Sequence, residues 1–341
     1  MKNIRVLITV PEIEDELHLV KEVAALSSRL TVNYHQCLTD EDTAANLENI
    51  DVLYTQRPPT HLENANRLKW VQFCFTGIDK LVSNPIFEPE RQITVTNGAG
   101  AHAGPIAEYC LAAMGMLTRD FMQFLNDQRE KVRDRSHSRR ADLHGKTLGL
   151  VGYGHIGREV ARLATAYRMK ILAVERDPTW RTLTGFQWPN VGDPEGTLPE
   201  RFFNPDQLHE MLPECDYVVG CVPLTPQTEK LFGPREFEVM KKSAFFINVG
   251  RGRTLDDMAL AHALDKDVIA GAAVDVFAAD PGPLPADHPL WTLDNILITP
   301  HISGSRNSLY FQRMNDIFCA NLRRYLGDES LLNVVAPGRG Y

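Results

Sequence analysis

Residues 147–157 constrain the fold most, because an apolar run there ends in three glycines. Gly152, Gly154 and Gly157 have the spacing G-x-G-x-x-G, and apolar side chains recur at helical intervals over residues 158–167. In such a strand–turn–helix the first glycine makes the tight turn, the second admits a pyrophosphate, and the third lets helix and strand pack closely. The phosphates lie at the positive end of the helix. Glycine turns also serve packing alone, so the spacing leaves both interpretations open.

Composition and charge describe a globular protein that is long enough for two domains. The chain has 341 residues, of which 43% are hydrophobic, and its formal net charge is -8. This charge argues against nucleic acid or an anionic membrane as a partner, although a substrate site can still be locally positive. The one basic cluster, residues 129–140, is interleaved with acids and serines. We interpret it as a solvated or subunit-contacting arm.

Neither a signal peptide nor a membrane segment is expected. Residues 1–10 form a short apolar run that ends at Pro11 and a group of acids, as a first strand does. No apolar stretch approaches the ~20 residues that span a bilayer. The cysteines show no C-x-x-C spacing; they are Cys37, Cys74, Cys110, Cys215, Cys221 and Cys319. We expect a reducing, cytoplasmic location, with neither disulfides nor a metal site.

Apolar runs alternate with helical patterns, which predicts an α/β protein with two parallel sheets covered by helices on both faces. In the first part we expect strands at 4–10, 30–35, 51–54, 70–75 and 93–96 and a helix at 12–27. In the second we expect, besides the glycine unit, strands at 170–174, 216–222, 244–249, 269–276 and 296–299 and helices at 226–232, 234–240, 256–264 and 307–326. A long apolar helix at 106–124 and the arm 126–143 lie between. Residues 177–205, rich in Pro and Gly, predict an irregular surface loop.

An acidic residue follows the second strand of the glycine unit. Glu175 lies about twenty residues beyond the glycines, where a carboxylate accepts hydrogen bonds from the ribose hydroxyls of NAD and repels the 2′-phosphate of NADP. Arg176 adjoins it and has the opposite charge. Because the acid occupies the key position, we favour NAD and leave NADP open.

Charged residues gather where the predicted parallel strands end. Ligands of open parallel sheets bind beyond the carboxyl ends of the strands. Those ends carry Glu175, Pro223, residues 250–252 around Arg251, residues 275–280 from Asp275 to Asp280, and His301. Taken singly, each has a plain explanation as a turn, a cap or a surface residue. If none of them had a functional role, all of them would have to lie at one edge of the sheet by chance.

Hydride transfer to a 2-oxo acid fits these residue types. A nicotinamide supplies the hydride. Arg251 offers the planar two-pronged donor that a carboxylate needs. His301 offers a proton for the carbonyl oxygen, and Asp280 offers a carboxylate that orients the histidine and favours its protonated form.

The chain resembles the D-isomer-specific 2-hydroxyacid dehydrogenases, among them lactate, phosphoglycerate and glyoxylate/hydroxypyruvate enzymes. The matching stretches are residues 145–149 leading into the glycines, 222–228, 248–252, 273–277 and 299–304. The resemblance implies a flavodoxin-like substrate domain of residues 1–100 plus 305–341. It also implies a Rossmann NAD-binding domain of residues 101–304, in which residues 101–143 build a homodimer.

The resemblance also implies residue roles. Arg251 binds and polarises a 2-oxo or D-2-hydroxy acid, His301 is the acid/base, and Asp280 is its partner. The backbone of Gly77 and Ile78 holds the substrate carboxylate. The cofactor-binding set is Gly152, Gly154, His155, Ile156, Glu175, Arg176, Val222, Pro223, Thr228, Val249, Gly250, Asp275 and Gly304, with Asp275 at the nicotinamide carboxamide.

Several points stay open at this level. The family usually has Glu-Pro where this chain has Asp280-Pro281, so the shorter side chain predicts a longer contact with His301 or a shifted loop. His102, after the hinge-like residues 97–100, and His155 are further candidates for ligand contacts. The substrate side chain is undetermined; residues 54–57 and 75–78 are expected near it. A nucleotide-sensing protein like the C-terminal-binding-protein co-repressors is the alternative, which the absence of an extended tail disfavours.

Overall fold

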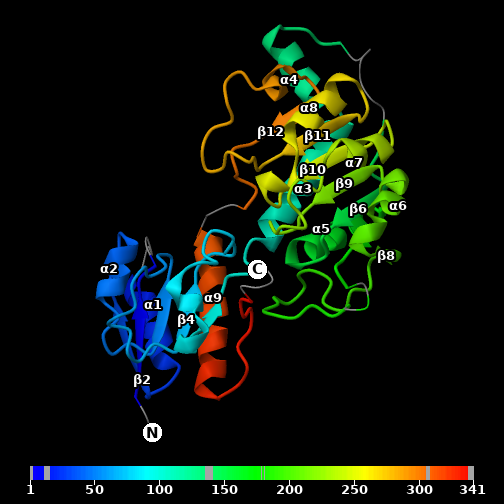
Figure 1. Ribbon diagram of the computed structural model, residues 1–341. Coiled ribbons are helices and arrows are strands. Elements are labelled where there is room, and N and C mark those ends of the chain that lie inside the picture. The colour runs from blue at the N-terminus through cyan, green and yellow to red at the C-terminus, as the bar shows by residue number, and fades with distance from the viewer. Residues whose placement is uncertain are drawn as a thin grey trace. The chain divides into compact units, whose positions relative to one another are not determined.

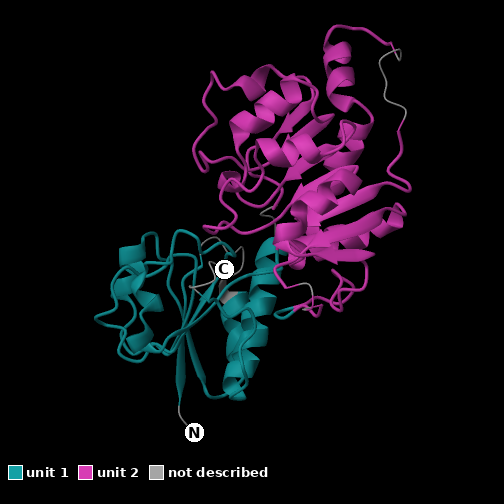
Figure 2. Cartoon of the chain, turned by 45° about the vertical axis from the view of Figure 1, so that its right-hand side comes forward, with its two compact units in different colours: residues 1–101, 184–186, 306–341 teal, residues 102–183, 187–305 magenta. Residues whose placement is uncertain are grey.

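The fold is described from a computed structural model, which covers residues 3–10, 16–134, 141–177, 179, 181–304 and 308–336. The chain divides into two units (Figure 2). Unit 1 comprises Met1–Ala101, Thr184–Phe186 and Arg306–Tyr341, and unit 2 comprises His102–Leu183 and Gln187–Ser305. A short piece of the predicted loop 177–205 therefore groups with unit 1, while the residues on either side of it group with unit 2.

Unit 1 is built on a five-stranded parallel sheet with the order β2-β1-β3-β4-β5. The strands are β1 Ile4–Ile8, β2 Leu30–Tyr34, β3 Val52–Thr55, β4 Trp70–Phe73 and β5 Thr94–Thr96. Val6 of β1 pairs with Val32 on one side and Val52 on the other. This order is the flavodoxin-like one, and it confirms the predicted fold of the first part.

Helices α1 (Glu16–Ala25), α2 (Asp40–Ala45) and α9 (Ser308–Leu326) complete unit 1. Helix α9 comes from the far end of the chain and runs alongside the sheet (Figure 1). Its Phe318 stacks on Tyr54 of β3, with the ring centroids 4.3 Å apart. The buried amide of Asn321 donates to Gln72 of β4 at 3.1 Å and bonds both backbone groups of Leu332. Helix α9 and Leu332 are thus part of the packing of unit 1.

Unit 2 is built on a seven-stranded parallel sheet with the order β12-β11-β10-β9-β6-β7-β8. The strands are β6 Thr147–Val151, β7 Lys170–Val174, β8 Arg201–Phe203, β9 Tyr217–Gly220, β10 Phe245–Asn248, β11 Gly271–Val274 and β12 Ile296–Ile298. The strand order reverses between β6 and β9, which is the switch point of a Rossmann fold. The predicted doubly wound dinucleotide-binding architecture is confirmed.

Helices cover both faces of the sheet in unit 2. Ile171 and Ala173 of β7 face a core shared with α3 (Ala103–Thr118) and α5 (His155–Ala166). Leu172 and Val174 face the opposite core, beneath α6 (Leu208–Met211), α7 (Pro234–Val239) and α8 (Asp257–Asp265). Short 3-10 helices lie at Pro85–Phe87, Pro89–Arg91, Pro205–Gln207, Leu212–Glu214, Gly252–Thr254 and Pro289–Thr292. Because strands buried on both faces are continuous apolar runs, they were visible in the sequence.

Three local predictions were wrong. The apolar pattern at 106–124 is two helices, α3 and α4 (Phe121–Arg129), because Asp120 between them has a left-handed backbone with φ 54°. Residues 226–230 form turns, and Phe232 forms a β-bridge with Leu255, so no helix lies at 226–232. The loop 177–205 contains the edge strand β8, which pairs with β7. Part of the arm, residues 135–140, lies outside the described residues.

All six thiols are free, and burial raises the pKa of Cys215 and Cys319 to about 12. Within the described ranges, no helix is both long and apolar enough to cross a bilayer.

Candidate functional site

The predicted site residues of unit 2 lie at one edge of its sheet. Since all seven strands are parallel, the residues that follow them share the carboxyl edge. Read along the sheet from β12 to β7, this edge carries His301, Asp275, Arg251, Pro223, Gly152 and Glu175. The structure therefore places the predicted reactive side chains and the glycine turn along a single rim.

The glycine turn between β6 and α5 has the geometry that each glycine was expected to provide. Gly152 has φ 102°, a conformation that side chains disfavour. A Cβ on Gly154 would meet nothing within 4 Å, so the space before it is open. A Cβ on Gly157 would lie 2.3 Å from the carbonyl oxygen of Gly152. The first glycine allows the turn, the second leaves open space, and the third allows close helix packing.

Glu175 is tied to the glycine turn. Its carboxylate accepts hydrogen bonds from the backbone N–H of Tyr153 at 3.2 Å and from that of Arg176 at 2.9 Å. The acid that follows β7 is thereby oriented beside the residue that stands between the first two glycines. His155 and Ile156 open helix α5 directly after this turn, and Ile156 packs partly against the core.

The strands β9 and β10 end in a close backbone approach. A Cβ on Gly250 would lie 2.7 Å from the carbonyl oxygen of Val222. Val249 is 4% exposed and belongs to the core beneath α3 and α5. Thr228 donates its hydroxyl to the carbonyl of Pro223 at 2.7 Å and closes the turn after β9. Contacts of these residues with a cofactor stay predictions.

Asp275 anchors the loop that carries His301. Its side chain is fully buried and accepts hydrogen bonds from the Thr299 hydroxyl at 2.5 Å, the Ile302 N–H at 2.9 Å and the Ser303 N–H at 2.9 Å. The backbone N–H of His301 donates to the Asp275 carbonyl at 2.9 Å. A buried carboxylate is stable only when donors replace its water, and here the loop supplies them. Its contact with the nicotinamide carboxamide stays a prediction.

Tyr109 of helix α3 extends this network. No sequence pattern had identified it as a candidate site residue. Its hydroxyl lies 2.8 Å from that of Thr299. Burial raises the pKa of Tyr109, so the hydroxyl remains neutral. The two residues are 190 positions apart, and no local pattern links them.

Arg251 follows β10 and has a fixed backbone. Its carbonyl accepts hydrogen bonds from the Thr254 N–H at 3.1 Å and the Thr254 hydroxyl at 2.6 Å. A Cβ on the next residue, Gly252, would lie 1.9 Å from the carbonyl carbon of Phe277. The turn that carries Asp280 therefore packs directly on the backbone that carries Arg251.

The structure brings His301 and Asp280 together. His301 Nδ1 lies 3.3 Å from Asp280 Oδ2, and the Phe277 N–H donates to the same oxygen at 3.1 Å. The His301 side chain is 54% exposed, and its backbone has φ 56°, in the left-handed region. The imidazole thus lies against a carboxylate and is about half exposed. The shorter aspartate reaches the histidine within ion-pair distance.

Gly77 and Ile78 lie in unit 1, just beyond the carboxyl end of β4. Their turn is held by Thr76, whose hydroxyl donates to the Gly98 carbonyl at 3.2 Å. Tyr54 was expected near the substrate but belongs to the core. It is 1% exposed and donates its hydroxyl to Asn315 of α9 at 3.0 Å.

The two remaining candidates of unit 2 lie near each other. A Cβ on Gly304 would meet the His102 ring at 3.0 Å. His102 stands just before α3. The ring and the glycine therefore pack together, and a ligand contact of either residue stays a prediction.

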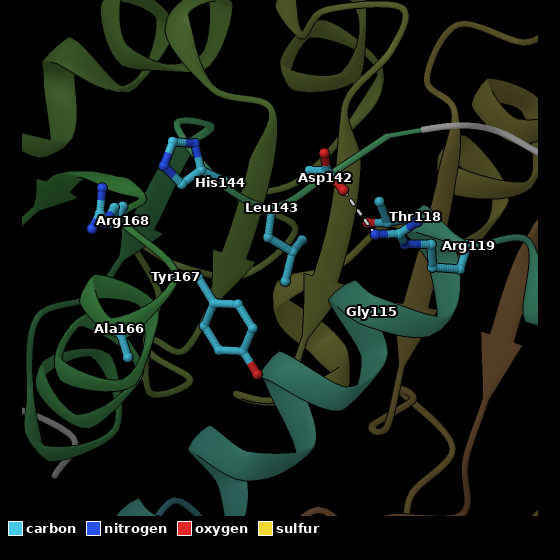
Figure 3. A pocket seen from close by; sticks show the side chains of 9 residues that line it. All are labelled: Gly115, Thr118, Arg119, Asp142, Leu143, His144, Ala166, Tyr167 and Arg168. Carbon is cyan, nitrogen blue, oxygen red and sulfur yellow. Dashed lines mark hydrogen bonds and ion pairs between the residues drawn. The ribbon is translucent and has the colours of Figure 1, made fainter.

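A separate cavity of about 400 Å³ lies where β6 and β7 begin, at the opposite edge of the sheet. Tyr167 extends from the end of α5 toward α3, and Arg119 pairs with Asp142 at 2.8 Å (Figure 3). Leu143, His144 and Arg168 complete the ring of larger side chains. The glycine turn and the charged strand ends take no part in this cavity.

Comparisons with known proteins agree with the geometry. The family model of the D-isomer specific 2-hydroxyacid dehydrogenase NAD binding domain matches residues 111–303. A D-3-phosphoglycerate dehydrogenase of Methanocaldococcus jannaschii is 30% identical over 336 residues, 97% of this chain and 59% of that protein. A glyoxylate/hydroxypyruvate reductase B of Enterobacter sp. is 41% identical over 165 residues, 48% of this chain and 46% of that protein. A D-isomer specific 2-hydroxyacid dehydrogenase of Xanthobacter autotrophicus in complex with NADPH and MES has a TM-score of 0.78 at 26% identity, and the match covers all of both chains.

The close approach at Gly252 yields a prediction. Gly252→Ala forces the Phe277–Ala278 peptide away, and we expect it to lower the free energy of unfolding by about 3 kcal/mol. Gly115→Ala is the control, because a Cβ there meets nothing within 4 Å and alanine favours a helix by about 0.5–1 kcal/mol. Urea unfolding measures both. Equal stability of Gly252→Ala and wild type would contradict the close approach.

Proposed function

Because the chain belongs to the D-isomer-specific 2-hydroxyacid dehydrogenase family, we propose that it transfers a hydride between a nicotinamide dinucleotide and a small 2-oxo or D-2-hydroxy acid. One observation carries the proposal. Arg251, Asp275 and His301 follow the adjacent strands β10, β11 and β12 at the edge that also holds the glycine turn. We assign dinucleotide binding to unit 2 and the role of substrate domain to unit 1. The free thiols fit a reducing cytoplasm.

The residues around the glycine turn fit a dinucleotide. The open space before Gly154 suits a pyrophosphate at the N-terminus of α5. Glu175 holds its carboxylate beside the turn and suits the two ribose hydroxyls of NAD. We therefore favour NAD over NADP, although the Xanthobacter relative contains NADPH. The bound nicotinamide supplies the hydride.

The side chains at the strand ends supply charge and a proton. Arg251 pairs with the substrate carboxylate and polarises the carbonyl. Substrate binding by the backbone N–H groups of Gly77 and Ile78, which lie in unit 1, is part of the proposal. His301 gives a proton to the carbonyl oxygen during reduction, and Asp280 at 3.3 Å holds the imidazole in orientation.

Activity assays test the assignment directly. We expect oxidation of NADH with at least one of glyoxylate, hydroxypyruvate and pyruvate, and weaker activity with NADPH. His301→Gln should lower kcat by about 10²–10⁴-fold because the proton donor is lost. Arg251→Lys should mainly raise KM for the 2-oxo acid, because lysine lacks the two-pronged donor.

Matched controls isolate these effects. His262→Gln and Arg253→Lys change exposed residues of the same types and should keep wild-type rates. No turnover with any of the three acids, together with tight NADH binding, would refute the enzyme and favour a nucleotide-sensing protein.

Substitutions at Asp280 test its pairing with His301. Asp280→Asn removes the carboxylate that lies 3.3 Å from His301 Nδ1 and should lower kcat about tenfold or more, because the imidazole loses the group that orients it. Asp280→Glu keeps a carboxylate and should retain most of the wild-type kcat. Asp287→Asn, an exposed acid of the same loop, should match wild type. Equal kcat values for Asp280→Asn and wild type would show that Asp280 does not act on His301.

A homodimer is the proposed assembly. Phe121 and Leu125 of α4 are 49% and 44% exposed, and Tyr167 beside the cavity of Figure 3 is 49% exposed. Phe121 and Leu125 are four positions apart in α4 and therefore lie on one helix face, which a second subunit would cover. Light scattering should give about twice the 38.4 kDa chain mass, and Phe121→Ser with Leu125→Ser should give monomers. A monomeric wild type would refute the dimer.

A further inference from the structure

Tyr153, the residue between Gly152 and Gly154, is fastened to the loop that follows β7. Its ring is 1% exposed, and its hydroxyl donates to Asp193 Oδ2 at 2.7 Å. The ring also meets Phe202 edge to face, with the centroids 5.3 Å apart. A residue within the glycine turn thus has its side chain anchored 40 positions away.

Asp193 is a buried carboxylate with a full set of donors. Oδ1 accepts from the N–H and hydroxyl of Thr197 at 3.0 and 3.3 Å, and Oδ2 accepts from the Leu198 N–H at 3.0 Å as well as from Tyr153. Burial raises the pKa of Asp193, but the hydrogen bonds from Leu198, Thr197 and Tyr153 outweigh it and leave the pKa lowered. The group is therefore a charged anchor and not a passive turn residue.

Arg158, the residue after Gly157, holds the same loop as well. It is 3% exposed and donates to three carbonyl oxygens: Tyr153 at 2.9 Å, Asp193 at 2.5 Å and Arg181 at 2.7 Å. Burial lowers the pKa of Arg158, and the nearby charges of Asp193 and Glu175 oppose that shift. All three guanidinium nitrogens of Arg158 are hydrogen-bonded within the protein, so Arg158 links Tyr153 of the glycine turn to Asp193 and Arg181.

Both backbone polar groups of Tyr153 are consequently held. The Tyr153 carbonyl accepts a hydrogen bond from Arg158, and the Tyr153 N–H donates to Glu175 Oε2 at 3.2 Å. Any shift of the turn therefore also moves the donor that orients Glu175.

We propose that Asp193 and Arg158 are positioning residues for the cofactor, through which the loop 181–198 clamps the glycine turn and aims Glu175 at the ribose hydroxyls. The clamp rests on the dinucleotide binding proposed above. It gives the loop a function, because the clamped turn raises affinity for NADH and discrimination against NADPH. The loop has a second attachment, the Gly192 N–H to Glu159 of α5 at 2.5 Å, which keeps it on the helix when Asp193 is changed.

Asp193→Asn is the decisive variant. Each carboxylate oxygen of Asp193 accepts from one backbone N–H, of Thr197 or of Leu198. Whichever way the asparagine amide is turned, its NH₂ group faces one of these N–H donors and cannot accept the hydrogen bond. Tyr153→Phe removes only one hydroxyl and leaves the other donors in place. Glu195→Gln is the matched control, since Glu195 is an exposed acid two positions away in the same loop.

Dissociation constants for NADH and NADPH, measured by fluorescence titration on the full chain, provide the readout. We expect Asp193→Asn to raise the Kd for NADH about tenfold and Tyr153→Phe about threefold, as loss of a charge-assisted and of a single hydrogen bond implies. The Kd for NADPH should change less, so the preference for NADH falls. Glu195→Gln should match wild type.

The outcomes separate the clamp from the catalytic proposal. Lower melting temperatures with unchanged or equally shifted Kd values would overturn the clamp, because a purely structural role does not alter the NADH to NADPH ratio. If Asp193→Asn does not fold, the ratio in Tyr153→Phe decides. A wild type that binds neither nucleotide overturns both proposals. Binding without turnover overturns only the reaction, since the clamp is measured by affinity.

Discussion

The position of His301 depends on one buried side chain, the carboxyl group of Asp275. A buried carboxylate without partners is strongly unfavourable, and Asp275 is fully buried at the end of β11. Thr299, Ile302 and Ser303 supply its donors. These residues flank His301, so the hydrogen bonds that the buried carboxyl group requires determine the path of the loop. The left-handed backbone of His301, with φ 56°, is maintained because the hydrogen bonds on both sides of it leave no relaxed alternative.

Much of the sheet architecture was predictable because parallel strands are buried on both faces and read as apolar runs. The same topology made the placement of the candidate residues predictable: parallel strands end at one edge, so charged residues after apolar runs gather there. The predictions failed where the local pattern was weak. Strand β8 is a three-residue edge strand whose first residue is exposed, and Asp120 breaks an apolar helix with its own backbone conformation. The turn after β9 depends on the Thr228 hydroxyl, which periodicity does not reveal.

The polar networks could not be predicted from the sequence for a different reason. Asp193 stands in a segment rich in Pro and Gly, where an aspartate is typical of a turn. Its partners Tyr153 and Arg158 are 40 and 35 positions away. Tyr109 and Thr299 are separated by 190 positions. Such contacts depend on tertiary packing, because these side chains meet only when α3 and α5 lie against the sheet.

The shorter carboxylate at position 280 shows how backbone contacts compensate for side-chain length. An aspartate extends one methylene less than a glutamate, yet its oxygen reaches His301 at 3.3 Å. Two features make this contact possible. Gly252 lets the Phe277 peptide lie against the strand end, where any Cβ would clash. The Phe277 N–H then donates to the same Asp280 oxygen at 3.1 Å and orients it. Gly252 and Asp280 are therefore linked through Phe277, whose carbonyl group packs on the glycine and whose N–H donates to the aspartate.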